Sequence, residues 1–329
     1  MLKTLHKLSI KFHSIETFRM IIGRNDAHLT LINRLFNVSI YSKGESIYVD
    51  TENNDIINEI EQLLNVMIKI TEHNIQITER DVMYIAKLLS EHHEEEIIDI
   101  YVNRHFIIKT KGGRSIYAKT INQKKYLKAI ETNDLVFGIG PAGTGKTYVA
   151  VLQAISKLRN GDVKKIILTR PAVEAGEKLG FLPGDLKEKV DPYLRPLYDA
   201  LYEILGTVQT EDMIDKGIIE IAPLAYMRGR TLDNAYVILD EAQNTTTNQM
   251  KLFLTRLGFR SKMVVTGDIT QIDLPRNSQS GLIQATRLLK DIEGIEIIAF
   301  DRIDVIRHPL VQKVLKEYEK YENKYNKFL

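Results

Sequence analysis

The chain has 329 residues, of which 44% are hydrophobic and 27% are charged, with a formal net charge of +2 and no cysteine. This composition is typical of a globular protein with a buried core, and the length predicts two domains. Without cysteine, the chain has no disulfide, thiolate zinc site or cysteine nucleophile, and the small net charge argues against a globally basic surface. No apolar run reaches the roughly 18 residues of a membrane span, and the N-terminus lacks the pattern of a signal peptide, so we expect a cytoplasmic protein.

The first 110 residues have the pattern of a small α+β domain. The stretch "LHKLSIKF" alternates like a strand, and two alternating runs around Lys43 and Gly44 predict a hairpin. Asp26 stands at the expected N-cap of a helix, and helical stretches are predicted over 53–71 and 79–100. The apolar face of the helix after Asp26 is expected to hold Leu29, Ile32, Leu35 and Phe36.

The remainder of the chain has the pattern of an α/β domain. We interpret the basic stretch 111–122, which contains a Gly-Gly pair, as a linker, and 123–329 as the second domain. Apolar runs separated by helical or loop stretches predict a mostly parallel sheet covered on both faces. These runs are "LVFGIG", "KKIILT", "IIEIA", "AYVILDE", "KMVVTGD" and "IEIIAF".

A phosphate-binding loop is predicted where the first of these runs ends. The stretch "GPAGTGKT" fits the pattern G-x-x-x-x-G-K-[ST] and lies between an expected strand and an expected helix. In such a loop, backbone N–H groups converge on phosphate oxygens, lysine reaches the outer phosphates and the hydroxyl binds Mg²⁺. The alternative is a glycine-rich turn with a coincidental lysine. The predicted ATP-binding residues are Gly140, Pro141, Ala142, Gly143, Thr144, Gly145, Lys146 and Thr147, with Lys146 also catalytic and Thr147 also a metal ligand.

Two later strands end in polar residues that complete this site. Parallel strands share one carboxyl edge, so Asp240 is expected to hold Mg²⁺ and Glu241 to orient or deprotonate the attacking water. The alternative is that both acids simply terminate a strand. Gln271, in "VVTGDITQIDLP", is expected to sense the γ-phosphate, the alternative being a Gly-Asp turn.

Six motifs together resemble the PhoH family, whose core is similar to that of superfamily-1 helicases. They are "GPAGTGKT", "PAVEAGEKLGFLPGD", "DPYLRPLYDAL", "APLAYMRGRTL", "VILDEAQNTT" and "TGDITQIDLP", and the resemblance covers about residues 120–322. It implies a RecA-like P-loop domain, ATP and Mg²⁺ as ligands, Mg-dependent hydrolysis and RNA as a partner. By the same analogy, Gln123 would read the adenine edge, and Tyr126 or Tyr148 would stack on the base.

The resemblance also implies a cation that completes the ATP site. Arg307, after the last strand, is the first candidate for this catalytic role, while Arg228 and Arg230 would act across a subunit boundary. Arg170 and Arg256 are further candidates, and surface salt bridges are the alternative for every one of them.

The N-terminal region resembles a KH-like module, which clamps nucleic acid with a GXXG loop. Here the corresponding residues are Gly23, Arg24, Asn25 and Asp26, so an acid replaces the second glycine. This module is expected either to bind RNA or to serve as a docking domain in an oligomer.

Two functions therefore remain open. The first is an RNA-coupled ATPase or helicase, which with one core per chain requires a homo-oligomer, such as a hexameric ring. The second is a nucleotide-gated adaptor that recruits an RNA-processing partner such as a ribonuclease. The breaker-rich loop 169–185 is expected to contact RNA or a neighbouring subunit, with Arg170 and Lys178 affecting RNA coupling rather than ATP affinity.

Overall fold

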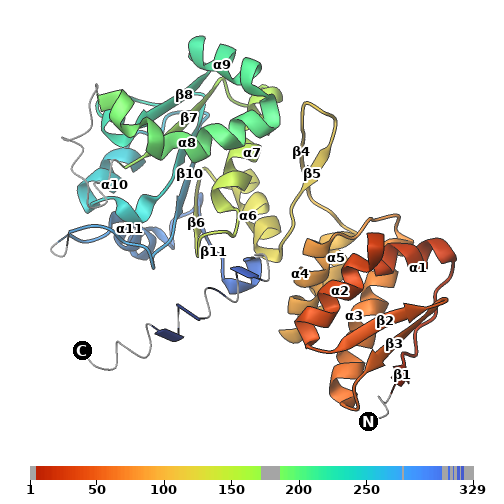
Figure 1. Cartoon of the computed structure of the whole chain (residues 1–329). Coiled ribbons are helices and arrows are strands. Elements are labelled where there is room, and N and C mark those ends of the chain that lie inside the picture. The colour runs from red at the N-terminus through yellow and green to blue at the C-terminus, as the bar shows by residue number, and fades with distance from the viewer. Residues whose placement is uncertain are drawn as a thin grey trace. The chain divides into compact units, whose positions relative to one another are not determined.

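A computed structural model (Figure 1) describes residues 5–171, 186–275 and 278–305, and positions 310, 311, 314, 317, 318, 320 and 321. At 186–193 and 196 it describes the backbone alone. The chain divides into two units, one formed by the residues up to Arg104 together with those after Val305, and the other by His105–Val305. Among the described residues, no helix combines the length and apolar character needed to cross a membrane.

The N-terminal unit is an antiparallel sheet packed with helices. The strands are ordered β1-β3-β2, and the hairpin between β2 and β3 turns at Gly44, whose φ is +62°. The expected hairpin is therefore present. Its elements are β1 (Leu5–Lys7), α1 (Ile15–Ile22), η1 (Arg24–Asp26), α2 (Ala27–Phe36), β2 (Ser39–Lys43), β3 (Ser46–Asp50), α3 (Asn54–Glu72), α4 (Glu79–Ser90) and α5 (Glu94–Tyr101).

Three local expectations for this unit need correction. The stretch 79–100 is two helices, because the chain turns through His92 at φ +61° and a second helix starts at three glutamates that favour a helix N-terminus. Asp26 is at the N-cap of α2, but its backbone is left-handed and its side chain makes no capping hydrogen bond. Leu29 and Ile32 are buried as expected, whereas Leu35 remains 37% exposed.

The second unit is built on a six-stranded sheet with the order β11-β6-β10-β9-β7-β8, and every neighbouring pair is parallel. This confirms the parallel sheet and all six strands expected from the apolar runs. The strand before the phosphate loop, β6, is separated from the strand before the paired acids, β9, by β10 alone. The strands are β6 (Leu135–Ile139), β7 (Lys165–Arg170), β8 (Ile219–Pro223), β9 (Ala235–Leu239), β10 (Lys262–Gly267) and β11 (Ile295–Ala299).

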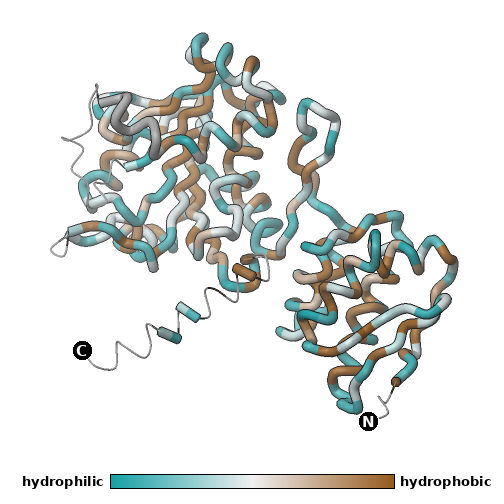
Figure 2. The backbone as a smooth tube through the Cα atoms, in the orientation of Figure 1, coloured by the Kyte–Doolittle hydropathy of each residue, from teal (hydrophilic) through white to brown (hydrophobic). Residues whose placement is uncertain are grey.

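Helices cover both faces of this sheet, because alternate strand residues point to opposite faces. One face, with Ile166 and Ile238, packs against α6, α7 and α8, and the other, with Phe137 and Val237, packs against α10 and α11. Figure 2 shows the hydrophobic residues gathered along the strands between these layers. The remaining elements are α6 (Ile121–Thr132), α7 (Lys146–Arg159), α8 (Leu186–Leu205), α9 (Thr207–Asp215), η3 (Leu224–Met227), η4 (Ala242–Asn244), α10 (Thr247–Leu254), α11 (Gly281–Leu289) and η5 (Arg302–Asp304).

The stretch suggested as a linker takes part in regular structure. Strands β4 (Phe106–Lys109) and β5 (Ser115–Tyr117) form a hairpin whose turn contains the Gly-Gly pair. The hairpin is anchored on the second unit, since Arg159 Nη1 donates to Lys109 O at 2.7 Å and the Lys111 amide donates to Ile204 O at 3.2 Å. Residues 111–122 therefore contain β5 and the first residues of α6.

A candidate nucleotide site at the carboxyl edge of the sheet

The phosphate loop connects β6 to α7. Gly143 and Gly145 have φ values of +88° and +81°, which a side chain would strain. A Cβ at Gly140 would lie 2.3 Å from Phe300 O, so close approach of the backbone also requires glycine there. Because α7 begins at Lys146, its first N–H groups face the loop and form the kind of concavity that binds phosphate.

Lys146 lies at the base of this loop with 9% of its surface exposed. Its Nζ donates a hydrogen bond to Pro141 O at 3.2 Å. Burial lowers the pKa of Lys146, and the nearby carboxylates of Asp240, Asp268 and Glu241 act in the opposite direction. The charges of these three carboxylates thus stabilise the buried ammonium group and offset part of the cost of its burial.

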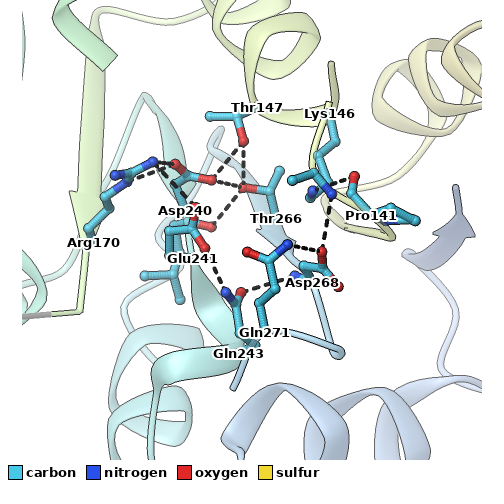
Figure 3. Close-up of polar contacts among 12 residues, drawn as sticks. Pro141, Lys146, Thr147, Arg170, Asp240, Glu241, Gln243, Thr266, Asp268 and Gln271 are labelled. Carbon is cyan, nitrogen blue, oxygen red and sulfur yellow. Dashed lines mark hydrogen bonds and ion pairs between the residues drawn. The ribbon is translucent and has the colours of Figure 1, made fainter. Parts of the chain in front are cut away.

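Asp240, at the end of β9, receives hydrogen bonds on one carboxylate oxygen from two hydroxyls. Thr147 Oγ1 donates to Asp240 Oδ1 at 2.7 Å, and Thr266 Oγ1 donates to the same oxygen at 2.6 Å (Figure 3). Asp240 is only 3% exposed. The sequence indicates Thr147 and Asp240, but no local pattern indicates Thr266. Thr266 lies on β10, the strand between β6 and β9.

The other oxygen of Asp240 is bound by Arg170, the last residue of β7. Arg170 Nε donates to Asp240 Oδ2 at 2.8 Å, and Nη2 donates to the same oxygen. Nη2 also lies 3.6 Å from Glu241 Oε1. The structure therefore places Arg170 beside both acids, at the side of the site where a metal ion is expected.

Glu241 adopts a left-handed backbone with φ +53° and ψ 38°, an uncommon conformation for this residue type. Its Oε2 accepts a hydrogen bond of 2.6 Å from Gln243 Nε2. Gln243 Oε1 in turn accepts from the Asp268 amide at 3.0 Å, and Gln243 is 1% exposed. Gln243 was not singled out from the sequence, although its place two residues after a pair of acids at a strand end is a usable signal.

Asp268 joins this network to the phosphate loop. Its Oδ2 accepts from the Ala142 amide at 3.1 Å and from Gln271 Nε2 at 2.9 Å. Burial acts to raise the pKa of Asp268, but hydrogen bonds from Thr270 and Ala142 and the charge of Lys146 outweigh it, and the pKa lies below its usual value. Gln271 therefore lies at the site edge and connects to the loop through Asp268.

Gln123 contacts the phosphate loop from α6. Its Nε2 donates to Thr144 O at 2.9 Å, and its Oε1 accepts from the Lys119 amide at 2.9 Å. A Cβ on Gly145 would come within 2.9 Å of the same Nε2. The side-chain amide of Gln123 supports the loop backbone, and the expectation that it forms hydrogen bonds with the adenine edge stays a prediction.

The two tyrosines considered for base stacking differ in environment. Tyr126 is fully buried, packs edge to face on Phe300 with ring centroids 5.3 Å apart, and lies beneath Gly138, so the suggestion that it stacks on a base is wrong. Tyr148 is partly buried, and burial together with Glu203 raises its pKa to about 12.

A cavity of about 440 Å³ lies over the phosphate loop. Its polar lining combines two cations with four carboxylates, so a polyanion entering it would need a further positive charge. Outside the phosphate loop, the cavity is lined by Tyr148, Arg170, Asp199, Ala200, Glu203, Asp240 and Glu241.

The other candidate arginines have different surroundings. Arg230 forms a two-pronged ion pair with Glu220, with distances of 2.6 and 2.7 Å, and Arg256 Nη1 donates to Arg230 O at 2.9 Å. Arg228 is exposed. Arg307 lies outside the described residues, as do Lys178 and the rest of the loop from 172 to 185.

The loop of the N-terminal unit that replaces GXXG keeps glycine-like backbone geometry. Gly23 has φ +78°, and a Cβ there would lie 2.8 Å from the ring of His28. Asp26 has φ +56°, so this carboxylate occupies a conformation that glycine adopts more readily. RNA binding by this loop stays a prediction.

The parallel sheet, with a phosphate loop after β6 and a buried acid after β9, defines a P-loop nucleotide-binding domain of the RecA-like type. Residues 115–319 match the family model for PhoH, described as PhoH-like protein. The chain belongs to the PhoH family.

Named relatives show the same similarity. The chain is 56% identical over 300 residues to the "PhoH-like protein" of Bacillus subtilis, covering 91% of this chain and 93% of that protein. It is 46% identical over 302 residues to the "PhoH-like protein" of Mycobacterium tuberculosis, covering 92% and 85%. It is 49% identical over 205 residues to "Protein PhoH" of Escherichia coli, covering 62% and 58%. The resemblance to the PhoH family inferred from the motifs is thus confirmed.

Proposed function

We propose that this protein is an Mg-dependent ATPase whose hydrolysis is coupled to RNA. The observation that carries the proposal is the contact of the Thr147 hydroxyl with the Asp240 carboxylate, 2.7 Å apart at the mouth of a phosphate loop. This contact joins the loop that follows β6 to the end of β9, two strands along the sheet, the arrangement that phosphoryl transfer in P-loop proteins uses.

Each residue around the cavity has a chemical role in this proposal. Backbone amides of the phosphate loop hold the phosphate chain, and Lys146 contacts its outer oxygens. Glu241, whose side chain is 44% exposed and borders the cavity, orients or deprotonates the attacking water. Gln271 reports on the terminal phosphate through its hydrogen bond to Asp268.

The residues present fit a magnesium ion. Thr147 and Asp240 supply a hydroxyl and a carboxylate, which are the hard oxygen donors that Mg²⁺ prefers, and they already lie within hydrogen-bond distance. When bound there, Mg²⁺ would neutralise charge that develops on the phosphate oxygens. Thr266 and Gln243 keep the two acids in place from the protein side.

Coupling to RNA is the finer part of the proposal. It is supported by two features of the sequence: the GXXG-like residues at Gly23–Asp26 and the breaker-rich stretch that follows Arg170. Because one RecA-like core is present per chain, RNA remodelling is proposed to need a homo-oligomer. We place this activity in the cytoplasm.

The deciding experiment is the rate of phosphate release with and without single-stranded RNA. Wild type should hydrolyse ATP with Mg²⁺ and be stimulated by RNA, and Lys146→Ala should abolish both. Lys290→Ala, which removes an exposed lysine of the same unit, is the matched control and should behave as wild type. Turnover that RNA does not change, together with ATP-dependent capture of a ribonuclease, would favour the adaptor instead.

A further inference from the structure

Asp240 is the residue on which two kinds of contact converge. Its Oδ1 accepts from the hydroxyls of Thr147 and Thr266, and its Oδ2 accepts from two N–H groups of Arg170. Asp240 therefore contacts Thr147, with which it is expected to bind a metal ion, and at the same time the positively charged guanidinium of Arg170.

Arg170 differs from an ordinary structural arginine of this protein. Arg230 spreads its two Nη atoms over both oxygens of Glu220. Arg170 instead directs Nε and Nη2 to a single oxygen of Asp240, and its Nη2 lies 3.6 Å from a second acid, Glu241. Its side chain is 15% exposed and lines the cavity. Arg170 thus has a second carboxylate within reach.

The charge of Arg170 opposes the binding of a divalent cation. The guanidinium of Arg170 carries a positive charge beside Asp240, so it repels a second cation that approaches the same carboxylate. Because the pair is almost enclosed by protein, the guanidinium charge is poorly screened and acts strongly on a second cation at the same carboxylate.

We propose that Arg170 is an internal counter-ion that competes with Mg²⁺ for Asp240 and shifts away from Asp240, towards Glu241, when the metal binds. The proposal rests on the proposed function, since it takes Asp240 as the metal ligand. It makes Arg170 a positioning residue, because it controls metal affinity and the local charge of the acid pair through Asp240.

The test measures the affinity of Mn²⁺ alone for the nucleotide-free full-length protein, with free Mn²⁺ followed by electron paramagnetic resonance. Mn²⁺ prefers the same oxygen ligands as Mg²⁺. Arg170→Ala should bind Mn²⁺ at least about tenfold more tightly than wild type, because the competing charge is removed. Arg170→Lys, which keeps the charge on a flexible stem, should fall between the two.

Two further variants separate the proposal from the proposed function. Arg287→Ala removes an exposed arginine on α11 and should leave Mn²⁺ affinity unchanged. The double variant Asp240→Asn/Arg170→Ala should lose the tight Mn²⁺ binding of Arg170→Ala, and this loss would show that Mn²⁺ binds at Asp240. Equal Mn²⁺ affinity in folded wild type and Arg170→Ala, with binding that still requires Asp240, would overturn the competition and leave the metal assignment intact. Tight binding that persists in the double variant would overturn both.

Discussion

Gln243 links the proposed general base to the phosphate loop, and replacing it tests the whole network. In Gln243→Met, the side chain keeps its length but loses two hydrogen bonds. One is donated to the Glu241 carboxylate at 2.6 Å, and the other is accepted from the Asp268 amide at 3.0 Å. Both the position of Glu241 and the pairing of a buried amide are therefore disturbed.

The magnitude follows from these contacts. A hydrogen bond to a charged group contributes about 1.5–3 kcal/mol, and a buried donor left unpaired costs about 1–3 kcal/mol. Because the side chain of Glu241 is 44% exposed, water replaces part of the first contribution. We expect Gln243→Met to lower the free energy of unfolding by about 2–4 kcal/mol. We expect turnover to fall by about 100-fold, since misplacing a catalytic group by about 1 Å has this effect.

The assay combines urea unfolding, followed by circular dichroism, with phosphate release under conditions where the variant is folded. Gln284→Met, on a partly exposed position of α11, is the matched control and should change neither quantity by much. Turnover within twofold of wild type, with the loss of stability present, would show that Gln243 is a structural bridge and that Glu241 is positioned without it.

Three further predictions concern packing, metal ligation and pH. Gly138→Ala should destabilise the second unit by about 1–3 kcal/mol, seen as a lower melting temperature, because the new Cβ would lie 2.9 Å from the Tyr126 ring; an unchanged melting temperature would contradict this packing. Thr266→Val should weaken Mn²⁺ binding about tenfold by removing the hydroxyl 2.6 Å from Asp240, whereas Thr286→Val should not. The stability that Tyr148 contributes should be present below pH 10 and should decline as the pH rises from about 10 to about 12. The reason is that the pKa of Tyr148 is raised to about 12 in the folded protein, whereas tyrosine in the unfolded chain loses its proton near pH 10. In urea titrations across this pH range, Tyr148→Phe should remove this part of the decline.

Local patterns in the sequence were sufficient to place the strands of the second unit and to predict that its sheet is parallel. The inner strands β6, β7, β9 and β10 are built mainly from consecutive β-branched or other apolar residues, so their existence depends on neighbours in the chain. The phosphate loop follows the same logic, because its glycines and Lys146 act through backbone conformations that are set within eight consecutive residues. Glu241 and Asp240 were also predicted, because a polar pair at the end of an apolar run marks a strand end.

The partners of these residues depended on strand order, which no local pattern contains. Thr266 contacts Asp240 because β10 lies between β6 and β9, and Arg170 contacts it because β7 is the next strand on the other side. Gln243 meets Asp268 for the same reason, across 25 residues of sequence.

Tyr126 shows the opposite failure, since the resemblance to helicase-like cores suggested that its ring stacks on a base. Helix α6 instead turns that ring towards the sheet, beneath Gly138, where burial of an aromatic surface is more favourable than exposure. By itself, then, the sequence determined which segments form the sheet and which residues form the phosphate-loop motif, because those properties are local. Only the tertiary structure decided which side chains share Asp240, because that depends on the order in which distant strands pair.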